Sequence, residues 1–380
     1  MEAGRRPWLA EIAVAEADDG GGYGLPELAV VLENLGREVY GGPLLSCAVA
    51  AAVIGAHGSD AQRIALLPGL ATGSHAASVA TGVGFAPALD GRFVGDAGPA
   101  LGATWASLHV VRCGEDAVVF ASDVVQPVAL EALDPALGVA RLIVDGPGEV
   151  LRGGGARLTR VLLVAVAAEA AGNARAALDT AVTYAKVREQ FGRTIGSFQA
   201  IKHHLADMLV RSELAVAAAW DVARVDASGG PEADLGAAGG AYVALDAAVR
   251  NAQTSIQIVG GIGFTWEHDA HLFLRRALTL AGLVGSVDNP GRADRDAGRC
   301  WCRPPSRVSL PPEAERYRAQ AREFVAQWHT TPPEHRRRLL VEDCRRHVRG
   351  QPQCHRRAHS WAAPRGCFEL TRPPITDDTC

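Results

Sequence analysis

The feature that most constrains the fold is a run of four long helical segments in the middle of the chain. Apolar residues recur there at helical spacing, and glycine- or proline-containing breaks separate the segments. The predicted helices run from about Leu158 to Gln190, onward from Phe198, from about Leu235 to Val259, and from about Glu267 to Gly282. Long helices joined by short connections predict an antiparallel four-helix bundle.

A different pattern precedes this region. Between about residues 76 and 145, short valine-rich runs alternate with glycine, proline and aspartate, which is typical of strands. The predicted strands are Ala77–Ala86, Ser107–Val111, Ala117–Val125 and Val139–Val144. Nearer the start, Leu25 to Gly41 carries apolar residues on one helical face and predicts an amphipathic helix.

These patterns predict an α+β fold that is mainly α, in four parts. We expect a partial N-terminal helical domain over residues 1–65 and a middle β domain over 66–152. The four-helix bundle follows over 153–286, beginning near the Gly153–Gly155 break. Residues 287–380 form an Arg/Pro/Cys-rich tail without sustained periodicity, for which little order is expected.

Composition favours a soluble, cytoplasmic protein. The hydrophobic content of 48% supports a large core, and a formal net charge of −4 gives no overall basic footprint for nucleic acid. The apolar run from Leu44 to Ala56 is shorter than the roughly 20 residues of a membrane-spanning helix. No apolar segment follows the arginines at the start, so no signal peptide is expected.

Two motifs point to a family. They are REQFGRTIGSFQAIKHHLADM, from Arg188 to Met208, and QIVGGIGFTWEHDAHLFLRRA, from Gln257 to Ala277. In this order they closely resemble the C-terminal bundle of acyl-CoA dehydrogenases, and the resemblance extends over about residues 8 to 286. Within that family, the sequence is similar in particular to the actinobacterial enzymes of steroid side-chain degradation.

The resemblance implies FAD held between subunits, and therefore an oligomer. A guanidinium at a helix end can bind a pyrophosphate, an aromatic ring can pack on adenine, and glycines let backbone amides approach phosphates. The residues expected to contact FAD are Arg188, Phe191, Gln199, Gln257, Gly260 and Gly261. Taken singly, the arginine is also explained as a favourable charge at a helix C-terminus, and the glycines as helix breakers.

The catalytic carboxylate of the family is missing. The resemblance implies a reaction in which a glutamate removes the α-proton of an acyl-CoA while FAD accepts a hydride. Its two usual positions correspond here to Leu162 and Val284, and neither side chain accepts a proton. The segment Gly95 to Val110 also departs from the family pattern, since Trp105 is out of register and the flavin-ring face is expected to be unformed.

Other side chains offer weaker alternatives. Glu169, within the apolar first bundle helix, is the nearest substitute base, although a buried, hydrogen-bonded structural role is the favoured explanation for it. A metal site formed by Glu267, His268, Asp269 and His271 competes with simple stabilisation of a helix N-terminus by acidic residues. We therefore predict no metal.

The tail supports two interpretations. A zinc module is one, although the spacing of its ligands fits poorly: Cys300, Cys302, Cys344, His347, Cys354 and His355. The other is that Leu310–Trp328 is the first helix of a second acyl-CoA dehydrogenase unit. On that hypothesis the chain is the inactive first half of a fused two-unit enzyme, cut short by a frameshift or a wrong gene model, with its start clipped as well.

Two functions follow from the resemblance. The first is an FAD-dependent acyl-CoA dehydrogenase subunit acting on a bulky, steroid-derived acyl-CoA, with the base supplied by a partner chain or another residue. The second is a non-catalytic subunit that completes the FAD sites of an active partner. Both imply a homo- or hetero-oligomer and an electron-transfer acceptor, and neither implies nucleic acid or a membrane. A nucleic-acid or zinc-binding role of the tail is a third alternative.

Overall fold

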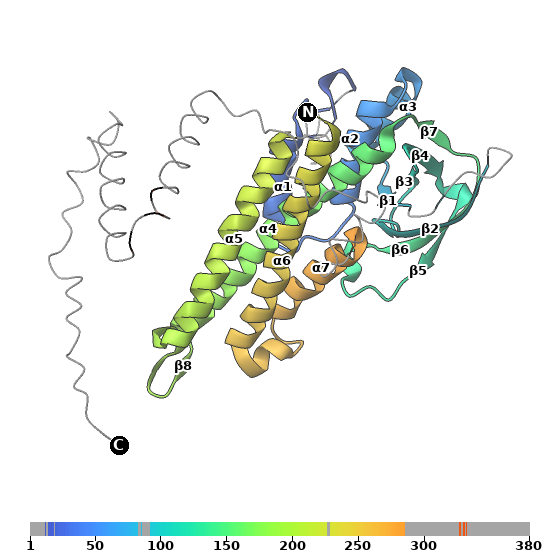
Figure 1. Ribbon diagram of the computed structural model, residues 1–380. Helices are drawn as coiled ribbons and strands as arrows, with labels where there is room; N and C mark the ends of the chain where they lie inside the picture. The colour runs from blue at the N-terminus through green and yellow to red at the C-terminus, as the bar shows by residue number, and fades with distance from the viewer. Residues whose placement is uncertain are drawn as a thin grey trace, which may run out of the picture. The chain divides into compact units, whose positions relative to one another are not determined.

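The computed structural model describes residues 12, 14–18, 20–82, 85, 92–225 and 229–285, together with three isolated residues at 327, 330 and 332. Residues 1–302 and 303–380 form two separate units. The zinc and second-unit hypotheses for the tail, and the predicted lack of order there, fall outside the described residues. The fold below is that of the first unit (Figure 1).

Three helices begin the chain: α1 (Leu25–Arg37), α2 (Leu44–His57) and α3 (Asp60–Thr72). Helix α1 confirms the predicted amphipathic helix and ends at Arg37 instead of Gly41. Helix α2 was not predicted, because nearly all its residues are buried and it shows no single apolar face. Helix α3 begins at a capping box, in which the Ser59 hydroxyl accepts from the Gln62 N–H, and continues past the expected domain boundary at residue 65.

One seven-stranded sheet follows, in the order β5-β6-β2-β1-β3-β4-β7. Strands β1 and β3 are parallel and the other neighbouring pairs are antiparallel. The strands are β1 (Ala77–Ala80), β2 (Phe93–Leu101), β3 (Leu108–Cys113), β4 (Asp116–Ala121), β5 (Val125–Ala129), β6 (Ala140–Gly146) and β7 (Glu149–Leu151).

The predicted strands correspond to β1, β3, β4 and β6, and the other three were missed. Strand β2 contains three glycines or prolines and a register shift between Asp96 and Gly98, which hide its alternation. The prediction that one strand runs from Ala117 to Val125 is wrong. A 3₁₀ turn over Ser122–Val124 separates β4 from β5, because the chain there leaves β4, which lies between β3 and β7, and enters β5 at the far edge of the sheet.

The two faces of the sheet belong to different cores. One face packs with α2 and α4 into the main core, which also contains Ala77, Val79 and Val110. The other face closes over a smaller core around three phenylalanine rings, with centroids 5.2 to 6.0 Å apart: Phe85, Phe93 and Phe120. The sheet is therefore buried on both faces over much of its area.

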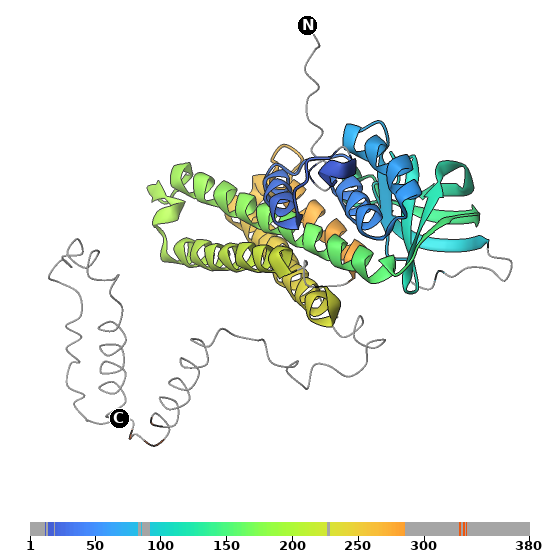
Figure 2. The ribbon, with the colours of Figure 1, turned by 90° about the horizontal axis from the view of Figure 1, so that it is seen from above.

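The predicted bundle is confirmed. Its helices are α4 (Gly154–Val187), α5 (Gln199–Val225), α6 (Gly230–Val259) and α7 (Ala270–Val284). Helix α4 is central and packs against the other three as well as α1 and α2 (Figures 1 and 2). Among the described residues, α4 is also the helix long and apolar enough to cross a membrane, but 89% of its apolar window is buried inside the protein. Its apolar character is thus that of a core helix.

Glycines bring α1 unusually close to α4. A Cβ on Gly172 would stand 1.8 Å from the Glu33 carbonyl oxygen, and one on Gly36 would stand 2.0 Å from the Glu169 carbonyl oxygen. Neither position tolerates a side chain, because both neighbours are backbone atoms. The N-terminal helices are thereby fixed against the bundle, and the expected fold class, α+β and mainly α with a small β domain and a C-terminal bundle, is confirmed.

Candidate functional site at one end of the bundle

The first half of the site is a tight hairpin between α4 and α5. Arg188 caps α4 with an extended backbone, and its N–H donates to the Tyr184 carbonyl at 2.9 Å. Strands β8 (Glu189–Gln190) and β9 (Arg193–Thr194) then pair across a two-residue turn. Phe191 and Gly192 in that turn have φ of +55° and +77°, the left-handed conformation at both positions that such turns require.

Phe191 is therefore held in a conformation that costs a non-glycine residue free energy. Its ring is 91% exposed and meets the Phe198 ring edge-on at a centroid distance of 6.1 Å. The Arg193 guanidinium covers Phe198 at 4.1 Å from the ring centre. The turn therefore presents an aromatic side chain to solvent.

The second half of the site is the glycine-rich end of α6. The helix ends at Val259, and Gly260 adopts φ +76° and ψ −145°, a backbone conformation that is essentially restricted to glycine. The turn η7 (Gly260–Phe264) follows. Apart from the adjacent chain, no atom lies within 4 Å of where a Cβ would stand on Gly260 or Gly261, so there is open space beside these two glycines. The Gly260 N–H itself donates to the Ile256 carbonyl oxygen.

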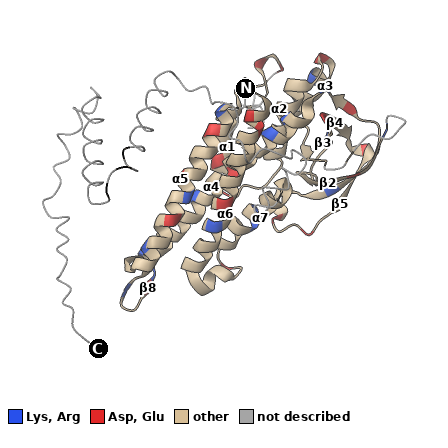
Figure 3. Cartoon of the chain, viewed as in Figure 1, with Lys and Arg blue, Asp and Glu red and all other residues tan. Residues whose placement is uncertain are grey.

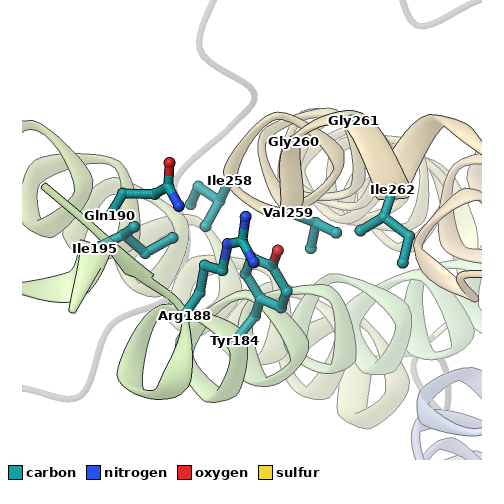
Figure 4. A pocket seen from close by; sticks show the side chains of 9 residues that line it. All are labelled: Tyr184, Arg188, Gln190, Ile195, Ile258, Val259, Gly260, Gly261 and Ile262. Atoms are coloured by element: carbon teal, nitrogen blue, oxygen red, sulfur yellow. The ribbon is translucent and has the colours of Figure 1, made fainter. Parts of the chain in front are cut away.

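The two halves line an open cavity of about 430 Å³. Figure 4 shows the Arg188 and Tyr184 side chains of α4 pointing toward the end of α6 at Val259. Its lining residues are Tyr184, Arg188, Gln190, Ile195, Ile258, Val259, Gly260, Gly261 and Ile262. One guanidinium thus faces an apolar wall and two exposed glycines.

Three of the six predicted FAD-contact residues line this cavity: Arg188, Gly260 and Gly261. The others, Phe191, Gln199 and Gln257, are exposed on the same two helix–turn segments but do not line it. The Gln199 Nε2 lies 3.5 Å from the His203 Nε2. Their contact with FAD stays a prediction.

Sequence reasoning missed Tyr184 and Ile262 in the lining. Tyr184 lies one helical turn before Arg188, so the spacing of four offered a signal. Ile262 lies inside the glycine turn that was already singled out. Ile258 and Val259 come from the apolar end of α6, where nothing in the sequence separates a cavity wall from core. Gln190 and Ile195, which were also missed, come from the hairpin between α4 and α5.

Large aromatic side chains also stand exposed just after the glycine turn. Phe264 is 90% exposed and Trp266 is 78% exposed. The Trp266 ring meets His271 at 4.9 Å between centroids and lies 5.3 Å from the Arg275 guanidinium carbon. His271 and its acidic neighbours form no metal cluster, since none was found among the described residues.

Both usual positions of the catalytic base are apolar and belong to the main core. Leu162 is 3% exposed within α4, and Val284, the last residue of α7, packs half-buried against the same cluster. Trp105 lies in the turn after β2 and packs against Gly138. A Cβ on Gly138 would stand 2.5 Å from the Trp105 ring.

Glu169 is enclosed by a buried ion-pair network. Arg276 of α7 donates to Glu169, to Asp134 at 2.5 Å, and to the carbonyl oxygens of Val39 and Tyr40 at 3.3 and 3.0 Å. Burial raises the pKa of Glu169, and the adjacent Arg276 charge acts in the opposite direction. The Glu169 carboxylate thus has a hydrogen-bond donor and a counter-charge, the Arg276 guanidinium, inside the core.

Comparison with known proteins agrees with this architecture. Residues 8–74 match the family model for the acyl-CoA dehydrogenase N-terminal domain, and residues 160–288 match that for the C-terminal domain. The chain is 34% identical over 278 residues to acyl-CoA dehydrogenase IpdE2 of Mycobacterium tuberculosis, a match that covers 73% of this chain and 79% of IpdE2.

Acyl-CoA dehydrogenase FadE34 of the same species is 42% identical over 289 residues, covering 73% of this chain and 39% of FadE34. The chain therefore spans about two fifths of that relative's length. Among solved structures, a variant of the Tcur3481-Tcur3483 steroid ACAD has a TM-score of 0.70 at 28% identity, covering 76% of this chain and 84% of that one. The chain belongs to the acyl-CoA dehydrogenase family, for which FAD-dependent dehydrogenation is general.

Proposed function

We propose that this chain is a non-catalytic subunit that completes an FAD site on an active acyl-CoA dehydrogenase chain. The proposal rests on the contrast between a formed cavity and a missing base. The cavity at Arg188 and Gly260 is present, whereas both positions that usually hold the catalytic carboxylate are apolar. The chain retains one half of a cofactor site without the group that the reaction requires.

The cavity fits part of a dinucleotide. The Arg188 guanidinium can pair with a pyrophosphate through two parallel N–H donors. The open space at Gly260 and Gly261 lets a phosphate come close to the backbone of this turn, and the exposed Phe191 residue offers a ring on which adenine can stack. When bound, FAD supplies the hydride acceptor of the family's reaction.

The α-proton of an acyl-CoA needs a base close to the reacting carbon. Leu162 and Val284 supply none, and Glu169 is paired with Arg276 inside the core. We therefore assign the base to the partner chain. Catalysis by this chain through Glu169 would require the ion pair to break, which is costly for a buried charge.

The similarity to steroid-ACAD structures supports a bulky, steroid-derived acyl-CoA as the substrate of the assembly. One solved neighbour is a complex of two proteins, ChsE4-ChsE5 of Mycobacterium tuberculosis, and it has a TM-score of 0.67 at 23% identity, which shows the fold alone. We propose a hetero-oligomer with a second acyl-CoA dehydrogenase chain, an electron-transfer acceptor for the reduced flavin, and a cytoplasmic location.

The test is the flavin spectrum of the chain alone and of the chain purified with an acyl-CoA dehydrogenase chain encoded beside it. We expect flavin in the complex only. Arg188→Ala should lower the FAD affinity of the complex roughly 10- to 100-fold, because a charge-assisted hydrogen bond is lost. Arg152→Ala, at an 85% exposed arginine in the β domain, is the matched control and should leave it unchanged.

Stoichiometric FAD on the lone chain, bleached by an acyl-CoA, would overturn the proposal and show that a base exists in this chain. If Arg188→Ala leaves the FAD affinity of the complex unchanged, the cavity is not part of the FAD site.

A further inference from the structure

Tyr184 lines the cavity one helical turn before Arg188 on α4. A spacing of four places both side chains on the same face of that helix. Figure 4 shows both of them pointing toward the end of α6 at Val259. A tyrosine hydroxyl and a guanidinium therefore reach into the same cavity from one helix.

The Tyr184 ring is held in place from the opposite half of the site. It meets the His268 ring edge-on, with centroids 6.4 Å apart and an interplanar angle of 86°. The His268 Nδ1 accepts a hydrogen bond of 3.0 Å from the Ala270 N–H at the start of α7, which anchors that imidazole. The Tyr184 ring thus joins the end of α4 to the connection between α6 and α7, and this contact orients the ring in the cavity wall.

The hydroxyl of Tyr184 is available to a ligand. Within the part of the chain that the structure describes, it makes no hydrogen bond to a protein group. Arg188 cannot accept its proton, because a guanidinium carries donors only. The surrounding wall is largely apolar and includes Ile195, Ile258 and Ile262. A hydrogen bond to a ligand is electrostatically stronger in such surroundings than in water.

The charges around the cavity favour an anion. Gln190, the other polar side chain of the lining, donates one of its amide hydrogens to the Glu189 carbonyl oxygen at 2.7 Å. Between residues 184 and 204 there is one acidic residue, Glu189, against four exposed lysines and arginines: Lys186, Arg188, Arg193 and Lys202. Figure 3 shows basic segments, in blue, close to β8. A local excess of positive charge raises the concentration of a phosphate-bearing ligand at this end of the bundle.

From these observations we propose that Tyr184 is a further binding residue for FAD, and that its hydroxyl donates a hydrogen bond to an oxygen of the pyrophosphate that Arg188 holds. The inference rests on the proposed function, because it requires FAD in this cavity. The guanidinium supplies charge and the hydroxyl supplies a single directed donor, so together they favour one orientation of the pyrophosphate.

The test is the FAD affinity of the flavin-depleted complex, followed by the change in flavin fluorescence on binding. Tyr184→Phe removes the hydroxyl and keeps the ring against His268. We expect the dissociation constant for FAD to rise roughly 10-fold, as for a lost hydrogen bond to a charged group. Tyr242→Phe removes a hydroxyl from a 43% exposed tyrosine of α6 outside the cavity lining, and this matched control should leave the constant unchanged. The unfolding midpoint checks that both variants keep their fold.

A double-mutant cycle tests whether the two groups act on the same pyrophosphate. In Arg188→Ala the phosphates are no longer held beside the hydroxyl, so adding Tyr184→Phe should weaken FAD binding by less than about 3-fold. If Tyr184 only fills the wall, Tyr184→Phe has no effect in either background, because the ring and its contact with His268 remain.

An unchanged FAD affinity in Tyr184→Phe overturns the inference. So does an undiminished effect of Tyr184→Phe in the Arg188→Ala background, because the hydroxyl then acts elsewhere on the cofactor. Both outcomes leave the proposed function standing as long as Arg188→Ala by itself weakens FAD binding. If Arg188→Ala has no effect, the inference fails together with the assignment of this cavity to FAD.

Discussion

Arg276 of α7 and Glu169 of α4 form an ion pair inside the protein, 107 positions apart in the chain. Both side chains are almost fully buried, and Arg276 also binds Asp134 and two carbonyl oxygens at the end of α1. Burial lowers the pKa of Arg276, but the charges of Glu169 and Asp134 outweigh it and raise the pKa, so the guanidinium stays charged. One arginine thus connects the bundle, the sheet and the N-terminal helices.

Removing either partner of this pair should be strongly destabilising. Arg276→Met leaves two buried carboxylates without their counter-charge, and we expect a loss of about 3–5 kcal/mol in the free energy of unfolding. Urea titration measures it. Arg152→Met, which breaks an exposed pair, should cost less than about 1 kcal/mol. Similar losses for the two variants would show that the network contributes little.

His109 should make the protein less stable in acid. Its side chain is fully buried in the sheet, 2.7 Å from the Ser78 hydroxyl, and burial lowers its pKa from 6.5 to about 4. Between those two values the unfolded chain binds a proton that the folded protein does not. Stability therefore falls as pH drops through this window, by roughly 3 kcal/mol in all.

The measurement is the free energy of unfolding at several pH values between 4 and 7. His109→Leu should flatten this dependence. His204→Leu, at an exposed histidine on α5, should preserve it. An unchanged pH profile in His109→Leu would assign the acid sensitivity to other groups.

Adding a side chain where α1 and α4 approach each other closely should destabilise the protein. Gly172→Ala places a methyl group against the Glu33 carbonyl oxygen, and we expect a loss of about 1–3 kcal/mol because backbone must move. Gly239→Ala is the matched change at an open position within α6, and it should stabilise the helix by about 0.5–1 kcal/mol. Thermal unfolding compares the two, and an equal effect would contradict the close approach.

Substitutions at the two glycines of the turn should distinguish an effect on protein stability from an effect on FAD binding. Gly260→Ala forces an alanine into φ +76° and ψ −145° and should cost about 1–3 kcal/mol of stability. Gly261→Ala lies at a position with open space and should leave stability nearly unchanged, while its methyl group hinders a phosphate at the amide. In the flavin-bearing complex we expect lower FAD affinity for both variants. Full FAD affinity in Gly261→Ala would place the phosphates elsewhere.

The sequence by itself determined the bundle, the family and three of the nine residues that line the cavity. Helical periodicity is a local signal, so α4, α5, α6 and α7 were predicted from spacing and glycine breaks alone. The resemblance of the two motifs to acyl-CoA dehydrogenases singled out Arg188 and Gly260, and both residues line the cavity. The absence of a base at Leu162 and Val284 also needed only the register of the two motifs.

Tertiary structure decided the rest, because it depends on contacts between residues distant in the chain. Helix α2 has no amphipathic face to read, since its neighbours cover it on every side. The sequence favoured a buried structural role for Glu169, but its partner, Arg276 of α7, became known only from the fold. The cavity wall at Tyr184 and Ile262 exists only once the helices are packed. Helical periodicity gives each helix its faces, and only packing decides which of them remain uncovered.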